Sequence, residues 1–159
     1  MNRKVKWAGI GVLALAAAQL IPVPRTNPQI ETGVPVSQEL EAVMRRSCFD
    51  CHSNETVWPW YSRVAPVSWL LAHDVYEGRE HVNYSTWNRL STEEQAKAIE
   101  ESWEHVEEGD MAPWYYEMMH ERARLSDADM ALFRGWAETA RSAAALAHPV
   151  ALATEATAH

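Results

Sequence analysis

Apolar residues recur along most of the chain at spacings of three and four, a pattern that predicts amphipathic helices. The first helix is expected to start near Ser37, whose side chain suits an N-cap, and to end in the pentapeptide CFDCH at residues 48–52. Its apolar face would carry Leu40, Val43, Met44, Cys48 and Cys51. The pattern therefore predicts that both cysteines of the chain lie on the buried face of one helix.

Three further helices are predicted downstream. Gly78 is expected to end the second, whose shared face carries Trp69, Ala72, His73 and Tyr76. Capping-box patterns, Ser91 with Glu94 and Ser126 with Asp129, open the third and fourth, and Gly109 stops the third. The inward positions are Ala96, Ile99, Trp103 and Val106, then Leu132, Phe133, Trp136, Ala137 and Ala140. No segment alternates with a period of two over a useful length, so we predict an all-α fold without a sheet.

The N-terminus has a different pattern. Three basic residues, Arg3, Lys4 and Lys6, precede a 17-residue apolar stretch at residues 7–23. This arrangement predicts an export signal. The stretch is at the lower limit for a membrane span, and the alanines before Gln19 suit cleavage, so a signal peptide and a retained anchor both remain open. In both cases the remainder is expected on the periplasmic side of a bacterial cytoplasmic membrane.

These patterns divide the chain into four parts. Residues 1–24 are the signal peptide or membrane anchor, and the proline-rich residues 25–36 form an extended linker. Residues 37–141 form the folded domain. Residues 142–159 are an alanine-rich tail, expected to be partly disordered, to which we assign no function.

Composition narrows the classes of partner. The chain has 159 residues, with 14 Lys and Arg against 22 Asp and Glu, a net charge of -8. It has no basic stripe that would neutralise phosphates, so we expect no nucleic-acid partner. Seven of the eight tryptophans follow residue 57, which indicates either a tryptophan-rich core or a flat ligand.

CFDCH contains both cysteines, and its CxxCH pattern has several rival interpretations. A dithiol redox site needs the motif at the start of a helix after a strand, and no strand is predicted here. A structural zinc site needs a second ligand pair, which the chain lacks. A disulfide between Cys48 and Cys51 would close too short a loop to stabilise the fold much.

Covalent haem attachment uses every part of the motif. Cys48 and Cys51 would each form a thioether with one porphyrin vinyl group, and His52 would ligate the iron. Export fits as well, because c-type haem is attached after translocation. We therefore predict a cytochrome c-like helical domain wrapped around one covalently attached haem c.

The chain resembles the haem-binding domain family, cytochrome c-like bacterial proteins that generally follow a membrane-targeting segment. The matching segments are CFDCHSNETVWPWYS, APVSWLLAHDVYEGREHVNYSTW, GDMAPWYY and ARLSDADMALFRGW, and RTNP of the linker is also similar. The resemblance implies a monohaem c-type fold with Cys48 and Cys51 as attachment points and His52 as axial ligand. Family members often show MPP and HP where this chain has Met111-Ala112-Pro113 and His120-Glu121.

The sixth iron ligand separates an electron carrier from a reactive haem. Met111 is the leading candidate, 59 residues beyond His52 in a loop bounded by Gly109 and Pro113. A thioether is soft, favours Fe(II) and excludes small ligands. The alternatives are a Met111 that only fills the core, ligation by His73 or His81, and a vacant position. His105 and His120 lie in acidic segments that we expect to be exposed.

Several other residues are candidates for contact with the porphyrin. The aromatics Trp58, Trp60, Tyr61 and Trp69 are expected to line it, although an ordinary core would also explain them. Arg63 and Arg79 would pair with the propionates, or else are solvated surface residues.

These features predict a non-enzymatic cytochrome that passes single electrons between redox partner proteins, held at the membrane if the N-terminal helix is uncleaved. The rival from another class is a haem enzyme or gas sensor with an open distal site. A third class is a structural or dithiol protein without haem.

Overall fold

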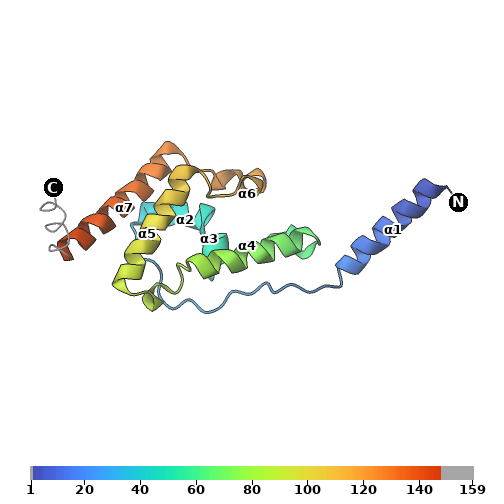
Figure 1. Cartoon of the computed structure of the whole chain (residues 1–159), viewed down its shortest axis with the longest axis horizontal. Helices are drawn as coiled ribbons and strands as arrows, with labels where there is room; N and C mark the ends of the chain where they lie inside the picture. The colour runs from blue at the N-terminus through green and yellow to red at the C-terminus, as the bar shows by residue number, and fades with distance from the viewer. Residues whose placement is uncertain (1, 148–159) are drawn as a thin grey trace, which may run out of the picture.

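Seven α-helices and three short 3-10 helices make up the regular structure of residues 2–147, the part of the chain that the computed structural model describes (Figure 1). Among these residues the extended segments meet in one isolated bridge, between Thr32 and Thr86, and form no strand. The predicted all-α class is confirmed. The elements are α1 (Arg3–Ala18), α2 (Gln38–Ser47), α3 (Phe49–His52), η1 (Trp60–Arg63), α4 (Val67–His81), η2 (Trp87–Arg89), α5 (Thr92–Glu108), α6 (Trp114–Met119), η3 (Glu121–Ala123) and α7 (Asp127–Ala147).

The core lies where α5 and α7 run beside each other and α2 packs against them (Figure 1). The aromatic side chains of Tyr84 and Trp87, from the segment before α5, complete it. The inward positions predicted for α2, α5 and α7 are largely confirmed. The fully enclosed ones are Leu40, Val43, Met44, Trp103, Val106, Phe133 and Ala137.

Four of the predicted helix boundaries are confirmed, at Ser37, Ser91, Gly109 and Ser126. The Ser37 hydroxyl accepts a hydrogen bond from the Leu40 amide and caps α2. Ser91 and Glu94 form a reciprocal capping box at the start of α5, with bonds of 2.8 and 3.3 Å. Ser126 and Asp129 do the same before α7. Gly109 ends α5 with a φ of 79°, a left-handed conformation that glycine adopts without strain.

Two predicted boundaries are wrong. The helix from Ser37 does not continue through the cysteines, because Cys48 leaves helical geometry (φ −122°) and separates α2 from the one-turn α3. Gly78 does not end α4, which runs on to His81. This glycine is buried inside the helix, where its missing side chain lets another segment approach.

The predicted apolar face of α4 is also wrong. Trp69, His73 and Tyr76 are exposed, whereas Ser68, Val75 and Gly78 are buried. The helix therefore packs through its small residues. Small side chains allow α4 to lie close against α3, and the large aromatics are left on the outer face.

The proline-rich linker is extended, as predicted, and is held along the domain by hydrogen bonds. The Glu31 and Val34 amides donate to the carbonyls of Ser85 and Tyr84, at 2.9 and 3.0 Å. The Asn27 side chain donates to the Thr56 carbonyl at 2.9 Å. The linker is thus part of the packed surface beside the segments that follow α3 and α4.

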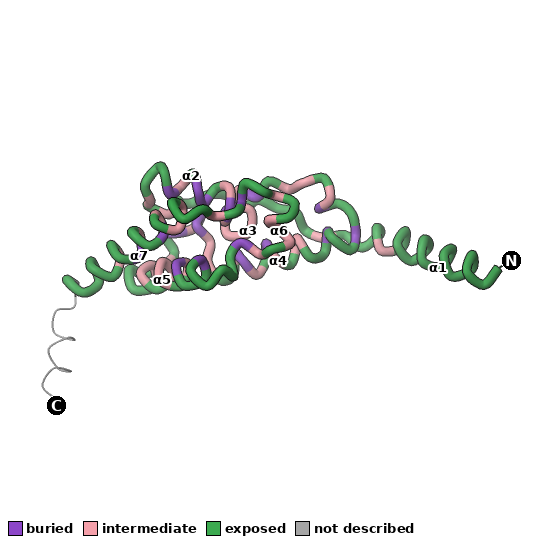
Figure 2. Tube along the Cα trace, turned by 90° about the horizontal axis from the view of Figure 1, so that it is seen from above, coloured by how far each residue is buried: buried purple, intermediate pink, exposed green. Residues whose placement is uncertain are grey.

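Helix α1 is exposed from Arg3 to Ala17, as the green tube in Figure 2 shows, and only its last residue, Ala18, is partly covered. Within residues 2–147, the structure contains no helix with the length and apolar character needed to cross a membrane. At the other end, α7 continues to Ala147, past the predicted domain boundary at residue 141. The remaining tail residues, 148–159, lie outside the described residues.

Candidate functional site

A cavity of about 360 Å³ opens between α3, α4, α5 and the segment that follows α5. Its volume falls within the roughly 300–1,000 Å³ of typical cofactor and ligand sites. Cys48, Cys51 and His52 line it, and so does Met111 from a segment far away in the sequence. The cavity therefore brings together the four predicted attachment and ligand residues.

The CxxCH motif is held by a single tight turn. The Cys48 carbonyl accepts hydrogen bonds from the Cys51 and His52 amides, at 3.1 and 2.9 Å. Residues three apart on such a turn face the same side, so the two sulfurs and the imidazole are presented together. The break at Cys48 turns this unit away from the axis of α2 without removing it from the cavity.

The two cysteines are free and half-buried. Burial raises the pKa of both the Cys48 and Cys51 thiols to about 12, and the carboxylates of Asp74 and Asp50 add to the effect at Cys51. Both thiols are therefore protonated at neutral pH. Dithiol redox sites depend on the opposite condition, a lowered pKa that yields a thiolate.

His52 is set up to offer a lone pair. Its Nδ1 lies 3.3 Å from the Val82 carbonyl oxygen, which can only accept, so Nδ1 carries the hydrogen. Burial lowers the pKa of His52, although hydrogen bonds to the backbone of Val82 and Gly78 act in the opposite direction. A neutral imidazole that donates from Nδ1 has its Nε2 lone pair free, which is how metal-bound histidines are commonly oriented.

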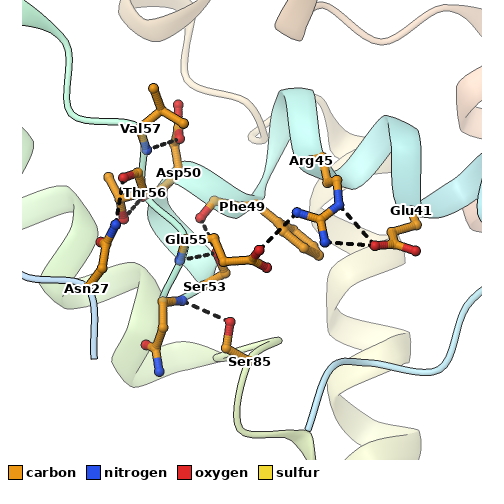
Figure 3. A network of polar contacts seen from close by, with 11 residues as sticks. Asn27, Glu41, Arg45, Phe49, Asp50, Ser53, Glu55, Thr56, Val57 and Ser85 are labelled. Atoms are coloured by element: carbon orange, nitrogen blue, oxygen red, sulfur yellow. Dashed lines mark hydrogen bonds and ion pairs between the residues drawn. The ribbon is translucent and has the colours of Figure 1, made fainter. Parts of the chain in front are cut away.

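The loop after the motif is fixed by hydrogen bonds to the Asp50 side chain and to backbone carbonyls of the motif (Figure 3). The Asp50 carboxylate accepts from the Val57 amide at 2.8 Å, and the Asp50 carbonyl accepts from the Thr56 hydroxyl at 2.7 Å. The buried Ser53 hydroxyl donates to the Phe49 carbonyl at 2.7 Å. These bonds hold α3 rigidly although it has only one turn.

Gly78 sets the distance between α4 and the motif. A Cβ at this position would lie 2.7 Å from the Cys51 carbonyl oxygen and 3.1 Å from its Cβ. Such contacts are too short for any side chain, so the backbone of α4 reaches the motif only through glycine. Sequence reasoning treated Gly78 as a helix end and missed this role.

We expect Gly78→Ala to lower the free energy of unfolding by about 1–3 kcal/mol, because the added methyl group overpacks the contact with Cys51. Gly135→Ala is the matched control. It also lies within a helix, α7, but a Cβ there meets no atom within 4 Å. The control should gain about 0.5–1 kcal/mol from helix propensity. Urea unfolding followed by circular dichroism measures both, and a Gly78→Ala variant as stable as the control would contradict this account.

Three side chains besides His52 supply a candidate ligand atom to the cavity. Met111 lies just past the end of α5, where its amide donates to the His105 carbonyl. His81, at the end of α4, also lines the cavity, whereas His73 is exposed and faces Glu77 instead. His105 is the third, and sequence reasoning gave it little weight. The available signal was its position one turn before Gly109, which keeps it close to Met111.

The cavity's aromatic walls differ from those predicted. Trp58, Trp60, Tyr61 and Trp69 do not line it, and Trp60 is 75 % exposed. The cause is local, because η1 follows Pro59 and carries Trp60 outward, while Trp69 lies on the outer face of α4. The aromatic residues that line the cavity besides His52, His81 and His105 are Tyr84, Tyr115, Tyr116 and Phe133.

Tyrosine–carboxylate pairs join α6 to the opposite wall. Tyr116 donates to Asp50 within the CxxCH motif at 2.7 Å, and Tyr115 donates to Asp74 of α4 at 3.2 Å. Burial, followed by the hydrogen bond to Asp50, raises the pKa of Tyr116. His120 stacks on Tyr116 and lies 3.2 Å from the Tyr61 hydroxyl. Tyr61 and His120 therefore lie outside the cavity lining, and His120 packs against the lining residue Tyr116.

The predicted arginine contacts are also different. Arg79 donates to the carbonyls of Ser53 and Thr26 at 2.7 and 2.9 Å and to two further side chains of the linker and loop. It is therefore neither a propionate partner nor a solvated residue, because it fastens the linker to the motif's loop. Arg63 is exposed and lies outside the cavity. The lining, as far as the structure describes it, has four carboxylates and no lysine or arginine.

A comparison with known protein families assigns the chain to a family. The haem-binding domain family matches residues 13–139. The chain belongs to the haem-binding domain family. No curated protein and no solved structure matches it. The family match establishes haem as the cofactor, so the predicted haem-binding domain is confirmed, while the roles of individual residues remain predictions.

The cavity of this haem-binding domain fits the cofactor in its donor set. One segment brings two sulfurs and a neutral imidazole, and a second brings a thioether, all into a single space walled by aromatic rings. Imidazole and thioether are ligands that suit haem iron. Cys48, Cys51, His52 and Met111 would hold haem here.

Proposed function

We propose that this protein is a c-type monohaem cytochrome that carries single electrons. The observation that carries the proposal is that Cys48, Cys51 and His52 line one cavity together with Met111. Each protonated thiol would add across one vinyl group, so that sulfur forms the thioether and the hydrogen goes to the neighbouring carbon. Haem bound in this way supplies a one-electron couple between ferric and ferrous iron.

His52 is the proposed axial ligand. Its hydrogen bond to the Val82 carbonyl fixes the ring and directs the free Nε2. The Tyr84 amide donates to the His52 carbonyl at 2.8 Å, which holds the backbone of the ligand as well. A ligand restrained at both ends needs little rearrangement when the charge on the iron changes.

Met111 is the proposed sixth ligand. Gly109 turns the chain at the end of α5, and the Met111 amide bonds back to the His105 carbonyl, so the loop is fixed beside the cavity. A thioether would favour the ferrous state and occupy the position that a small ligand needs. Ligation by Met111 would therefore favour an electron carrier over a haem enzyme or gas sensor.

The acidic lining supports a particular class of partner. Asp50, Asp74, Glu77 and Glu101 surround the cavity, and its described lining has no cationic lysine or arginine to offset them. A negative rim attracts a basic redox partner and repels an acidic one. We therefore propose that the unidentified electron donor and acceptor present basic surfaces.

The proposed location is the periplasmic side of the bacterial cytoplasmic membrane. The basic residues before α1 and the apolar residues within it support export. Trp7, Val12 and Leu13 are 65–71 % exposed, so α1 has an apolar surface that lipid would cover. Attachment of haem c after translocation requires the same location.

Carbon monoxide tests the proposal. The reduced full chain, produced with the cytochrome c maturation machinery, should be oxidised and reduced reversibly by one electron and should not bind carbon monoxide on rapid mixing. The physical reason is that Met111 would occupy the sixth position. Rapid binding of carbon monoxide would instead indicate an open site, as in a haem enzyme or sensor, and would reject the electron carrier.

A further inference from the structure

A second cavity, of about 290 Å³, lies at the junction of α1 and the folded domain. The residues that form it come from the end of α1 and the start of the linker on one side, and from the segment around η1 and α4 on the other. Among its lining residues are Gln19, Arg25, Arg63 and Ser68. It is separate from the haem cavity, because the two share no lining residue.

The junction is a defined contact. The Gln19 side chain accepts a hydrogen bond from the Ala65 amide at 3.0 Å and donates to the Ala65 carbonyl at 3.3 Å. The Arg25 guanidinium donates to the Ser62 carbonyl at 3.2 Å. These bonds attach the end of α1 to the domain beside η1, and the bonded residues Gln19, Arg25 and Ala65 line the cavity.

The charge of this cavity is opposite to that of the whole chain. Its lining has two arginines and no carboxylate, although the protein has a net charge of -8. Neither Arg25 nor Arg63 forms an ion pair within the described part of the chain. Two guanidinium groups facing one small polar space are suited to a phosphate, which accepts their paired N–H groups.

The surroundings indicate where the phosphate comes from. On one side of the cavity α1 is apolar and exposed, and Leu20 and Ile21 of the lining are 83 % and 56 % exposed. On the other side, apolar residues within three positions of the lining residues Arg63 and Ser68 are exposed: Trp60 by 75 %, Val64 by 43 % and Val67 by 42 %. A tryptophan and arginines next to apolar surface are typical of the level of lipid headgroups at a membrane.

We propose that Arg25 and Arg63 bind the phosphate of an anionic phospholipid headgroup at the junction of α1 and the domain. This inference rests on the proposed membrane location of α1. The apolar residues beside the cavity contact the acyl chains, and the two arginines hold the headgroup. A bound lipid then fixes the end of α1 against η1 and sets how the haem domain stands on the membrane.

Native mass spectrometry of the haem-loaded full chain in neutral detergent tests this inference. With phosphatidylglycerol as the probe, we expect one lipid per chain. In Arg25→Gln/Arg63→Gln, retention should fall at least about tenfold, because two charge-assisted interactions are lost. The matched control is Lys97→Gln/Arg141→Gln, which removes the same charge from exposed ion pairs of α5 and α7 and should retain the lipid.

Further measurements identify the source of the phosphate and exclude misfolding. If both double variants retained phosphatidylglycerol equally well, the proposal would be overturned. Displacement of the lipid by inorganic phosphate at the same concentration would also overturn it, because the site would then bind free phosphate. Arg63→Gln alone should also weaken retention. The Arg63 side chain is exposed and forms no ion pair among residues 2–147, so this substitution breaks no salt bridge that holds the fold. The same spectra report the mass of bound haem, so a failure of haem binding is seen separately from a failure of lipid binding.

Discussion

Replacing Cys48 and Cys51 together by serine should abolish covalent haem. The two sulfurs are the only thiols in the chain, and both line the cavity that also contains His52. A serine hydroxyl does not form the thioether, so haem would be held by axial ligation alone and would dissociate on denaturation. We expect a complete loss of haem staining on a denaturing gel after co-expression with the cytochrome c maturation machinery.

A matched control variant distinguishes loss of covalent haem attachment from a change in the packing of the cavity wall. Ser47→Ala changes another cavity-lining residue next to the motif and removes one side-chain bond to Arg46, but it leaves both sulfurs in place. It should stain as strongly as the unaltered protein. Each single cysteine variant should retain one thioether and give a reduced yield. Full staining of the double serine variant would reject attachment through the motif.

Met111→Ala should lower the reduction potential and open the iron to carbon monoxide. Loss of the thioether removes the ligand that favours ferrous iron. A fall on the order of 100 mV is expected, since axial ligands set haem potentials over roughly 0.8 V. Redox titration followed by absorption spectroscopy measures the potential, and rapid mixing of the ferrous protein with carbon monoxide measures access.

Two controls make this result specific to Met111. Met118→Ala removes a methionine of α6 that is 71 % exposed and lies outside the cavity lining, so the potential should not change. His105→Ala removes a second candidate ligand, which lies close to Met111 in the same cavity. If His105→Ala changed the spectrum while Met111→Ala left it unaltered, His105 would be the ligand and the assignment of Met111 would be wrong.

The helices were predictable because their signals are local. Capping boxes at Ser91 and Ser126, the stop at Gly109 and the apolar spacing of α2, α5 and α7 each depend on neighbours within a turn or two. The presence of Met111 in the same cavity as the motif agrees with its sequence position, in a loop bounded by Gly109 and Pro113.

Contacts set by tertiary packing were not predictable in the same way. An apolar stripe on α4 suggested that Trp69 faces inward, but the close approach to Cys51 selects the face with Gly78. Arg79 looked like a propionate partner or a surface residue, and only the path of the linker reveals its bonds to Ser53 and Thr26. Each outcome depends on segments far apart in the sequence.

The intact mass of the denatured full chain, produced with the cytochrome c maturation machinery, tests the central claim most directly. The account predicts a single species heavier than the bare chain by one haem, with both cysteines resistant to alkylation because their sulfurs are in thioether bonds. Fragmentation should place the added mass on the peptide that contains CFDCH. A chain of unmodified mass, with Cys48 and Cys51 both alkylated, would contradict the proposed c-type cytochrome.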